Sequence, residues 1–100
     1  MLMLMTIKIP HEPFNNFIRK GTAAKTIEKI LHAIKPKAAY FTEVDGNRGA
    51  LLVVDMKDPS DIPMLAEPWF LSFNADVSFR AAMTPEDLAH AHLDIVSKGW

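Results

Sequence analysis

The chain has 100 residues, 49% of them hydrophobic, which predicts a single domain over residues 1–100 with one core. Its net charge is −1 and no basic run is present, so we expect no nucleic-acid partner, because such binding depends on neutralising phosphates. The absence of cysteine excludes disulfides, thiol nucleophiles and thiolate metal sites.

The start of the chain predicts a strand over about Met3–Ile9, in which the β-branched residues Thr6 and Ile7 lie, and which Pro10 ends. Residues 1–5 are apolar, but they are too few to span a membrane and lack the basic flank and cleavage site of a signal peptide. We therefore expect a cytoplasmic protein with no membrane partner.

The next segment, from Pro13 to Lys35, predicts helical structure, because its apolar residues recur at the three- and four-residue spacing of one helix face. Gly21 and Thr22 interrupt this pattern, so we expect a kink or two helices, with Thr22 capping the second. The helix ends at Lys35, because the residue before Pro36 disfavours helical angles.

The centre of the chain predicts a β-hairpin, in which two apolar runs, Ala38–Val44 and Ala50–Met56, flank a turn over residues 45–49. We interpret the polar residues of this turn as turn-forming rather than as a site. Leu51–Val54 shows no alternation with polar residues, so both faces of this strand should be covered. Since one layer of helices covers one face only, this pattern indicates a dimer.

The segment after the hairpin predicts a helix followed by a strand. Asp58-Pro59 is a typical helix start, with a capping aspartate before a proline at the first helical position. The inner stripe of this helix consists of Ile62, Leu65, Trp69 and Phe73. We expect Pro68 to kink or end the helix, because proline lacks a backbone donor and clashes with the preceding turn. Apolar and polar residues then alternate over Ala75–Met83, which predicts a half-buried strand.

The last segment predicts one more helix, from Thr84 to about Ser97. Thr84 stands at the N-cap, and Asp87 occupies the position at which a capping box has Glu or Gln. The apolar surface of this helix is expected from Leu88, Ala91, Leu93, Ile95 and Val96.

The expected order of elements is strand, helix, strand, strand, helix, strand and helix, which is an α+β pattern. Two right-handed crossovers interleaved about the hairpin build a ferredoxin-like fold. We expect a four-stranded antiparallel sheet of strand order 4-1-3-2, with helices on one face and an additional C-terminal helix.

The four histidines do not predict a metal site. His90 and His92 are two residues apart on the expected helix and point to different sides, whereas helical metal pairs need a spacing of three or four. His32 is expected in packing or at the surface, and His11 lies alone in a loop. We find no cofactor motif and expect no cofactor and no metal.

Five polar residues lie inside the predicted strands: Tyr40, Thr42, Asp55, Ser78 and Arg80. One interpretation is a solvated face or a dimer interface with satisfied pairs, such as Arg80 with Asp55 or Asp76. The other is a pocket for a ligand, with Tyr40 as a proton donor and Arg80 as an anion anchor. No nucleophile, base and orienting group are brought together by the sequence, so the catalytic residues stay unknown.

Several segments together resemble an uncharacterised family of small bacterial proteins, over roughly residues 21–88. They are Ala39-Tyr-Phe-Thr-Glu-x-Asp-Gly-x-Arg48, Leu52-Val-Val-Asp-Met56, Asp58-Pro-Ser-x-Ile-Pro63, Ala66-Glu-Pro68, Phe73-Asn-Ala75 and Met83-Thr-Pro-Glu-Asp-Leu88. That family resembles the dimeric α+β barrel superfamily, which also holds small monooxygenases, muconolactone isomerase-like enzymes and stress-responsive barrel proteins. The resemblance implies a homodimer with two sheets around a cavity. It implies no specific reaction, and the histidine that several barrel enzymes use has no counterpart here.

Three functions are therefore expected as alternatives. The first is a homodimeric barrel that binds a small organic ligand between its sheets. The second is a cofactor-independent enzyme, similar to a monooxygenase or isomerase, which requires Tyr40 and Arg80 to point into a closed pocket. The third is a structural or regulatory interaction module with a filled interior.

Overall fold

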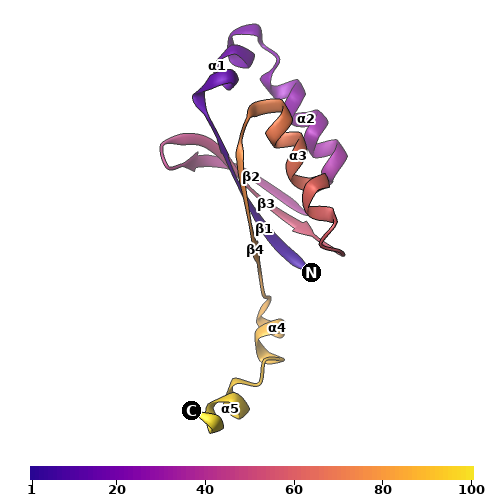
Figure 1. Cartoon of the computed structure of the whole chain (residues 1–100), viewed down its shortest axis with the longest axis vertical. Helices are drawn as coiled ribbons and strands as arrows, with labels where there is room; N and C mark the ends of the chain where they lie inside the picture. The colour runs from indigo at the N-terminus through magenta and orange to yellow at the C-terminus, as the bar shows by residue number, and fades with distance from the viewer.

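The computed structural model describes all 100 residues and contains one antiparallel sheet with the strand order β2-β3-β1-β4. The elements are β1 (Leu2–Ile9), α1 (His11–Lys20), α2 (Ala23–Ile34), β2 (Ala38–Val44), β3 (Asn47–Asp55), α3 (Asp61–Phe73), β4 (Asp76–Ala81), α4 (Pro85–Ala89), α5 (Leu93–Val96) and a 3-10 turn, η1 (Ser97–Gly99). The predicted α+β class and the 4-1-3-2 strand order are confirmed. Figure 1 shows α2 and α3 together on one face of the sheet.

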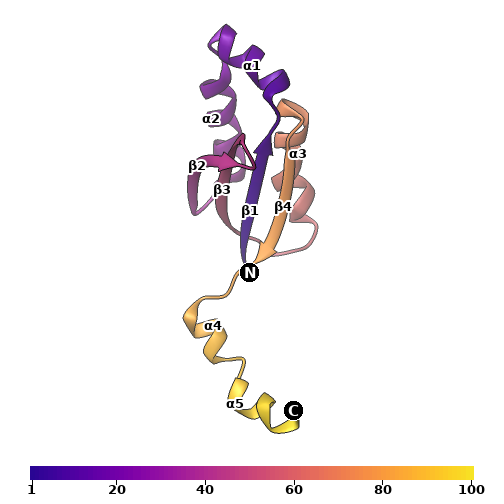
Figure 2. The same ribbon diagram turned by 90° about the vertical axis from the view of Figure 1, so that its left-hand side faces the viewer.

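The core lies between the sheet and these helices, because side chains alternate along each strand. In β1, Met3, Met5, Ile7 and Ile9 are buried and the residues between them are half-buried. The antiparallel partners of Met3, Met5 and Ile7 in β3 are buried too, namely Val54, Leu52 and Ala50. The opposite face of the sheet carries no helix (Figure 2), so it is uncovered within one chain.

The hairpin turn is shorter than predicted. The turn comprises Asp45 and Gly46 alone, with φ of 50° and 79°, which are the positive values of a two-residue type I′ turn. The following residues continue the ladder, so β3 begins at Asn47 rather than at Ala50. Gly49 is needed here because a Cβ at this position would lie 2.6 Å from the carbonyl oxygen of Ile7.

The first crossover consists of two helices, as expected from the interruption at Gly21. Gly21 has a φ of 73° and its N–H bonds to the carbonyl of Ile18, which ends α1. Thr22 stands at the N-cap of α2, but its side chain makes no capping hydrogen bond, so the predicted cap is wrong in that respect. Lys35 ends α2 in the left-handed conformation.

The second crossover helix begins later than predicted, and Pro68 does not end it. It begins at Asp61, because Asp58 accepts hydrogen bonds from the N–H (2.9 Å) and Oγ (2.8 Å) of Ser60 and forms a turn ahead of the helix. The helix continues through Pro68 to Phe73 instead of ending there. Burial of four residues of α3, including Trp69 and Phe73, outweighs the missing backbone hydrogen bond.

The last segment is not the continuous helix that was predicted. The capping box at Thr84 is present, since Asp87 N–H donates to Thr84 Oγ1 (3.1 Å) and Thr84 N–H donates to Asp87 (3.0 Å). The backbone then breaks at His92, which has a φ of 51°, and separates α4 from α5. The predicted apolar stripe finds nothing in the chain to pack against.

We call residues Met83–Trp100 the C-terminal arm. All of its residues are exposed, and it projects beyond the end of β4, away from both layers (Figure 1). It accounts for much of the elongated shape of the chain, whose extents are 60 × 27 × 19 Å.

Candidate functional site

All five polar strand residues belong to one surface, the face of the sheet that no helix covers; we call it the open face. The register places Tyr40 opposite Leu51, which lies opposite Thr6. Thr6 in turn lies opposite Ser78. Directly opposed residues in an antiparallel sheet point to the same side, so this row crosses all four strands on one face.

Two further rows complete the open face. Arg80 belongs to the row Ala38, Val53, Leu4 and Arg80, and Thr42 belongs to the row Thr42, Gly49, Lys8 and Asp76. Asp55 lies opposite Leu2 at the end of the face where β4 runs into the arm. Three strand spacings separate Tyr40 from the strand of Arg80, or about 14 Å. The predicted residues therefore share a face without converging within one chain.

Within one chain Arg80 forms neither of the suggested ion pairs, and a pair across a dimer interface stays a prediction. Arg80 has no carboxylate within ion-pair distance, and Asp55 instead accepts a hydrogen bond from the Met1 amino group at 3.0 Å. This ammonium group holds the pKa of the Asp55 carboxyl below its usual value, first through the hydrogen bond and then through its charge. The Arg80 guanidinium is thus free to bind an anion.

The open face is apolar at its centre although it is uncovered. Leu51 is 42% exposed and Tyr40 is 64% exposed, while Leu4 and Val53 are half-buried. A hollow of about 210 Å³ lies over the rows of Thr6 and Lys8, where Lys8 Nζ approaches Asp45 at 3.8 Å. A face with this composition is typical of an interface rather than of a surface that stays in water.

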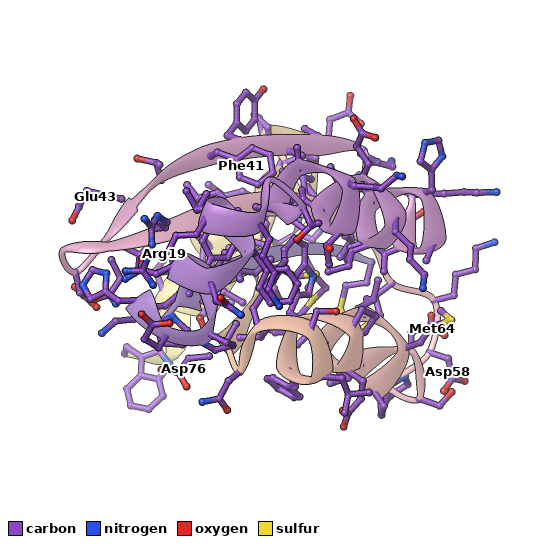
Figure 3. The ribbon with its side chains drawn as sticks, turned by 90° about the horizontal axis from the view of Figure 1, so that it is seen from above. Arg19, Phe41, Glu43, Asp58, Met64 and Asp76 are labelled. Atoms are coloured by element: carbon purple, nitrogen blue, oxygen red, sulfur yellow. The ribbon has the colours of Figure 1, made fainter.

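A second candidate site lies on the opposite side of the sheet, in a groove between the hairpin and the first two helices. We call it the hairpin groove; its volume is about 570 Å³, within the range of small-molecule sites. Its lining residues are Ile9, His11, Phe14, Ile27, Phe41, Thr42, Glu43, Gly46, Asn47, Arg48 and Gly49. Figure 3 shows Phe41 on the helix side of β2 and Glu43 near the tip of the hairpin.

Arg48 is the central charged group of the hairpin groove. Its guanidinium lies over the ring of Phe14, 5.1 Å from the centroid, and donates to Oδ1 of Asn15 at 2.7 Å. Glu43 does not pair with it and instead accepts the N–H of Gly46 at 2.6 Å. The groove therefore combines an apolar floor with a cation whose other donors are open.

Sequence reasoning missed the hairpin groove. His11 was noted as a lone loop histidine and Arg48 as part of a turn, and only the fold brings both to the same cavity. The sequence carries no signal for this groove, because the exposure of Phe41 and its place in an edge strand emerge only from the fold.

No group of three or more histidine and carboxylate side chains is placed to hold a metal ion. No helix has the length and apolar character needed to cross a membrane. No protein-family model matches the chain, and a search of curated proteins found no matching relative. The homodimer implied by the family resemblance is accordingly a proposal, argued below from the geometry.

Proposed function

We propose that the protein is a homodimer whose two open faces pack against each other and enclose a small organic ligand. The observation that carries this proposal is the open face itself. It has an apolar centre around Leu4, Leu51 and Val53, polar side chains at both edges, and no cover within the chain. Burying one leucine side chain contributes about 1.5–3 kcal/mol, so covering this centre favours association.

A two-fold axis parallel to the strands would complete the site. Such an axis places β2 of one copy over β4 of the other, because it reverses the strand order across the interface. Tyr40 of one chain then lies opposite the partner's Ser78 across sheets about 10 Å apart, and the partner's Arg80 is in the next row, about 7 Å further along the strand. Groups that are separated within one chain thus converge in the dimer, as a phenol and a guanidinium around an apolar space.

This arrangement favours an aromatic or aliphatic molecule that carries an anionic group. The apolar residues of the open face would hold its body, Arg80 would bind the anion, and Tyr40 would donate a hydrogen bond. The enzyme alternative requires the same closed pocket. Nothing in the structure favours it, since the one open-face carboxylate with a resolved shift, Asp55, has a lowered pKa and is a weak base.

Two matched leucine variants test the dimer. Leu51→Lys introduces a charge at the centre of the open face, and Leu71→Lys introduces the same charge on α3, where the leucine is 82% exposed. We expect the wild type and Leu71→Lys to be dimers at micromolar concentration by sedimentation equilibrium, and Leu51→Lys to dissociate. A monomeric wild type overturns the proposal.

Two matched arginine variants test the ligand site. The probe is anilinonaphthalene sulfonate, an aromatic anion, titrated into each protein by calorimetry. We expect Arg80→Gln to weaken binding about tenfold, the loss of one charge-assisted contact, and Arg48→Gln to leave it unchanged. Loss of binding in Arg48→Gln alone assigns the ligand to the hairpin groove instead. A dimer that binds no probe overturns the proposed ligand binding and supports the third alternative, a structural or regulatory interaction module.

A further inference from the structure

We infer that the C-terminal arm, Met83–Trp100, docks on a second copy of this chain. The inference rests on the proposed homodimer and adds a second contact to it. Within one chain no extensive contact joins the arm to a strand or helix of the α/β core, and all arm residues are exposed. Figure 2 shows the arm extending past the end of the sheet in the direction of the strands.

The arm has defined secondary structure but no core to support it. Its helices α4 and α5 contain five and four residues, whereas isolated helices shorter than about 12–15 residues are marginal in water. The capping box at Thr84 satisfies backbone donors at one end only. Persistent structure in such short helices requires tertiary contacts, and the chain itself supplies none.

The arm also exposes more apolar surface than a solvated tail. Six large apolar side chains are between 48% and 101% exposed within eighteen residues: Met83, Leu88, Leu93, Ile95, Val96 and Trp100. Segments that remain in water have few such residues. This many exposed apolar side chains in one segment favour an interaction site over a tail that stays in water.

The size of the open face argues that the partner is a second copy. Four strands at about 4.8 Å spacing and about six residues at 3.3 Å give a footprint of about 400 Å² per chain. A stable interface buries about 800 Å² per partner. The flat footprint of the open face is thus small for a stable dimer, and reciprocal docking of two arms enlarges the surface that the dimer buries.

The origin of the arm places it at the rim of that same interface. Ala82, the residue before the arm, donates its N–H to the carbonyl of Leu2 at 2.9 Å. The arm thus starts three residues beyond Arg80, at the end of the open face, and a two-fold axis parallel to the strands brings the partner's arm to the same end of the dimer. Two-fold symmetry gives both arms the same site, so no second kind of protein is needed.

Substitutions in the arm test this inference, because every arm residue is exposed and its replacement leaves the core of its own chain intact. The variants are Leu88→Lys and Leu93→Lys, with Leu71→Lys on α3 as the matched control and Leu51→Lys as the open-face comparison. Sedimentation equilibrium gives the dimer dissociation constant of each. We expect each arm variant to raise the dimer dissociation constant at least about tenfold, and Leu71→Lys to leave it unchanged.

Hydrogen exchange of the arm amides in the full chain provides the second readout. We expect protection of α4 and α5 in the wild type and its loss in Leu51→Lys. Protection that persists in a monomeric Leu51→Lys means that the arm folds back on its own core, which overturns the inference.

The two proposals fail in different ways. A dimer that dissociates with Leu51→Lys but tolerates both arm variants overturns the arm inference and supports the face-to-face dimer. A dimer that dissociates only with the arm variants overturns the face-to-face dimer and supports the arm. A monomeric wild type overturns both.

Discussion

Replacing Phe73 by alanine should be among the most destabilising single changes in the helix layer. Phe73 is fully buried at the end of α3 and packs against Phe14, Phe17 and Trp69, with ring centroids 4.9, 5.1 and 6.3 Å away. Core Phe→Ala changes cost about 3–5 kcal/mol, and loss of two edge-to-face pairs places this one at the upper end. The expected fall in Tm is at least about 15 °C for a domain of this size.

The Phe73→Ala substitution should also disturb the hairpin groove. Phe14 lies between Phe73 and the guanidinium of Arg48, so a cavity at position 73 releases the floor of the groove. The control is Phe70→Ala on the same helix, where the ring is 40% exposed and the expected cost is at most about 1–2 kcal/mol. Thermal unfolding at equal protein concentration compares the two. Equal losses for both variants would refute the assignment of Phe73 to the core.

Three further substitutions should alter the unfolding free energy: the first lowers it, the second raises it, and the third changes its dependence on pH. Gly49→Ala places a Cβ 2.6 Å from the Ile7 carbonyl oxygen and should lower the unfolding free energy by about 1–3 kcal/mol in denaturant titrations; an unchanged midpoint contradicts this. Pro68→Ala should raise it by about 1 kcal/mol or more, because alanine restores a backbone donor inside α3, and a lower Tm would count against it. Hydrogen bonds from Ser60 lower the pKa of Asp58, so its contribution is complete above the unfolded pKa of 3.8 and is lost as pH falls through the folded pKa. The unfolding free energy of Asp58→Asn should therefore fall less steeply than that of the wild type as the pH is lowered through the acid range. Identical pH dependences of the two proteins would exclude this role of Asp58.

The fold could be predicted because its signals are local. The hairpin, the stop at Pro36, the interruption at Gly21 and the capping box at Thr84 each depend on a few neighbouring residues. The errors occur where tertiary contacts override local preference. Pro68 stays inside α3 because the helix gains burial along its whole length, and the last helix breaks because it gains none.

The candidate sites show the same division. Alternation along a strand assigns a residue to a face, so Tyr40 and Arg80 could be placed on one surface from their neighbours. The distance between them depends on the strand order, which separates their strands by two others. The hairpin groove depends on the position of α1 against β3, a contact between residues 33 positions apart in the case of Asn15 and Arg48.

The amino-acid sequence by itself determined the class of fold, the strand order and the unusual apolar character of Leu51–Val54, because periodicity and turn chemistry act over a few residues. Only the tertiary structure decided that this apolar surface has no cover, that the groove of Arg48 exists, and that the C-terminal arm stands free. Burial of a side chain depends on what the rest of the chain brings to it, and no local pattern contains that information.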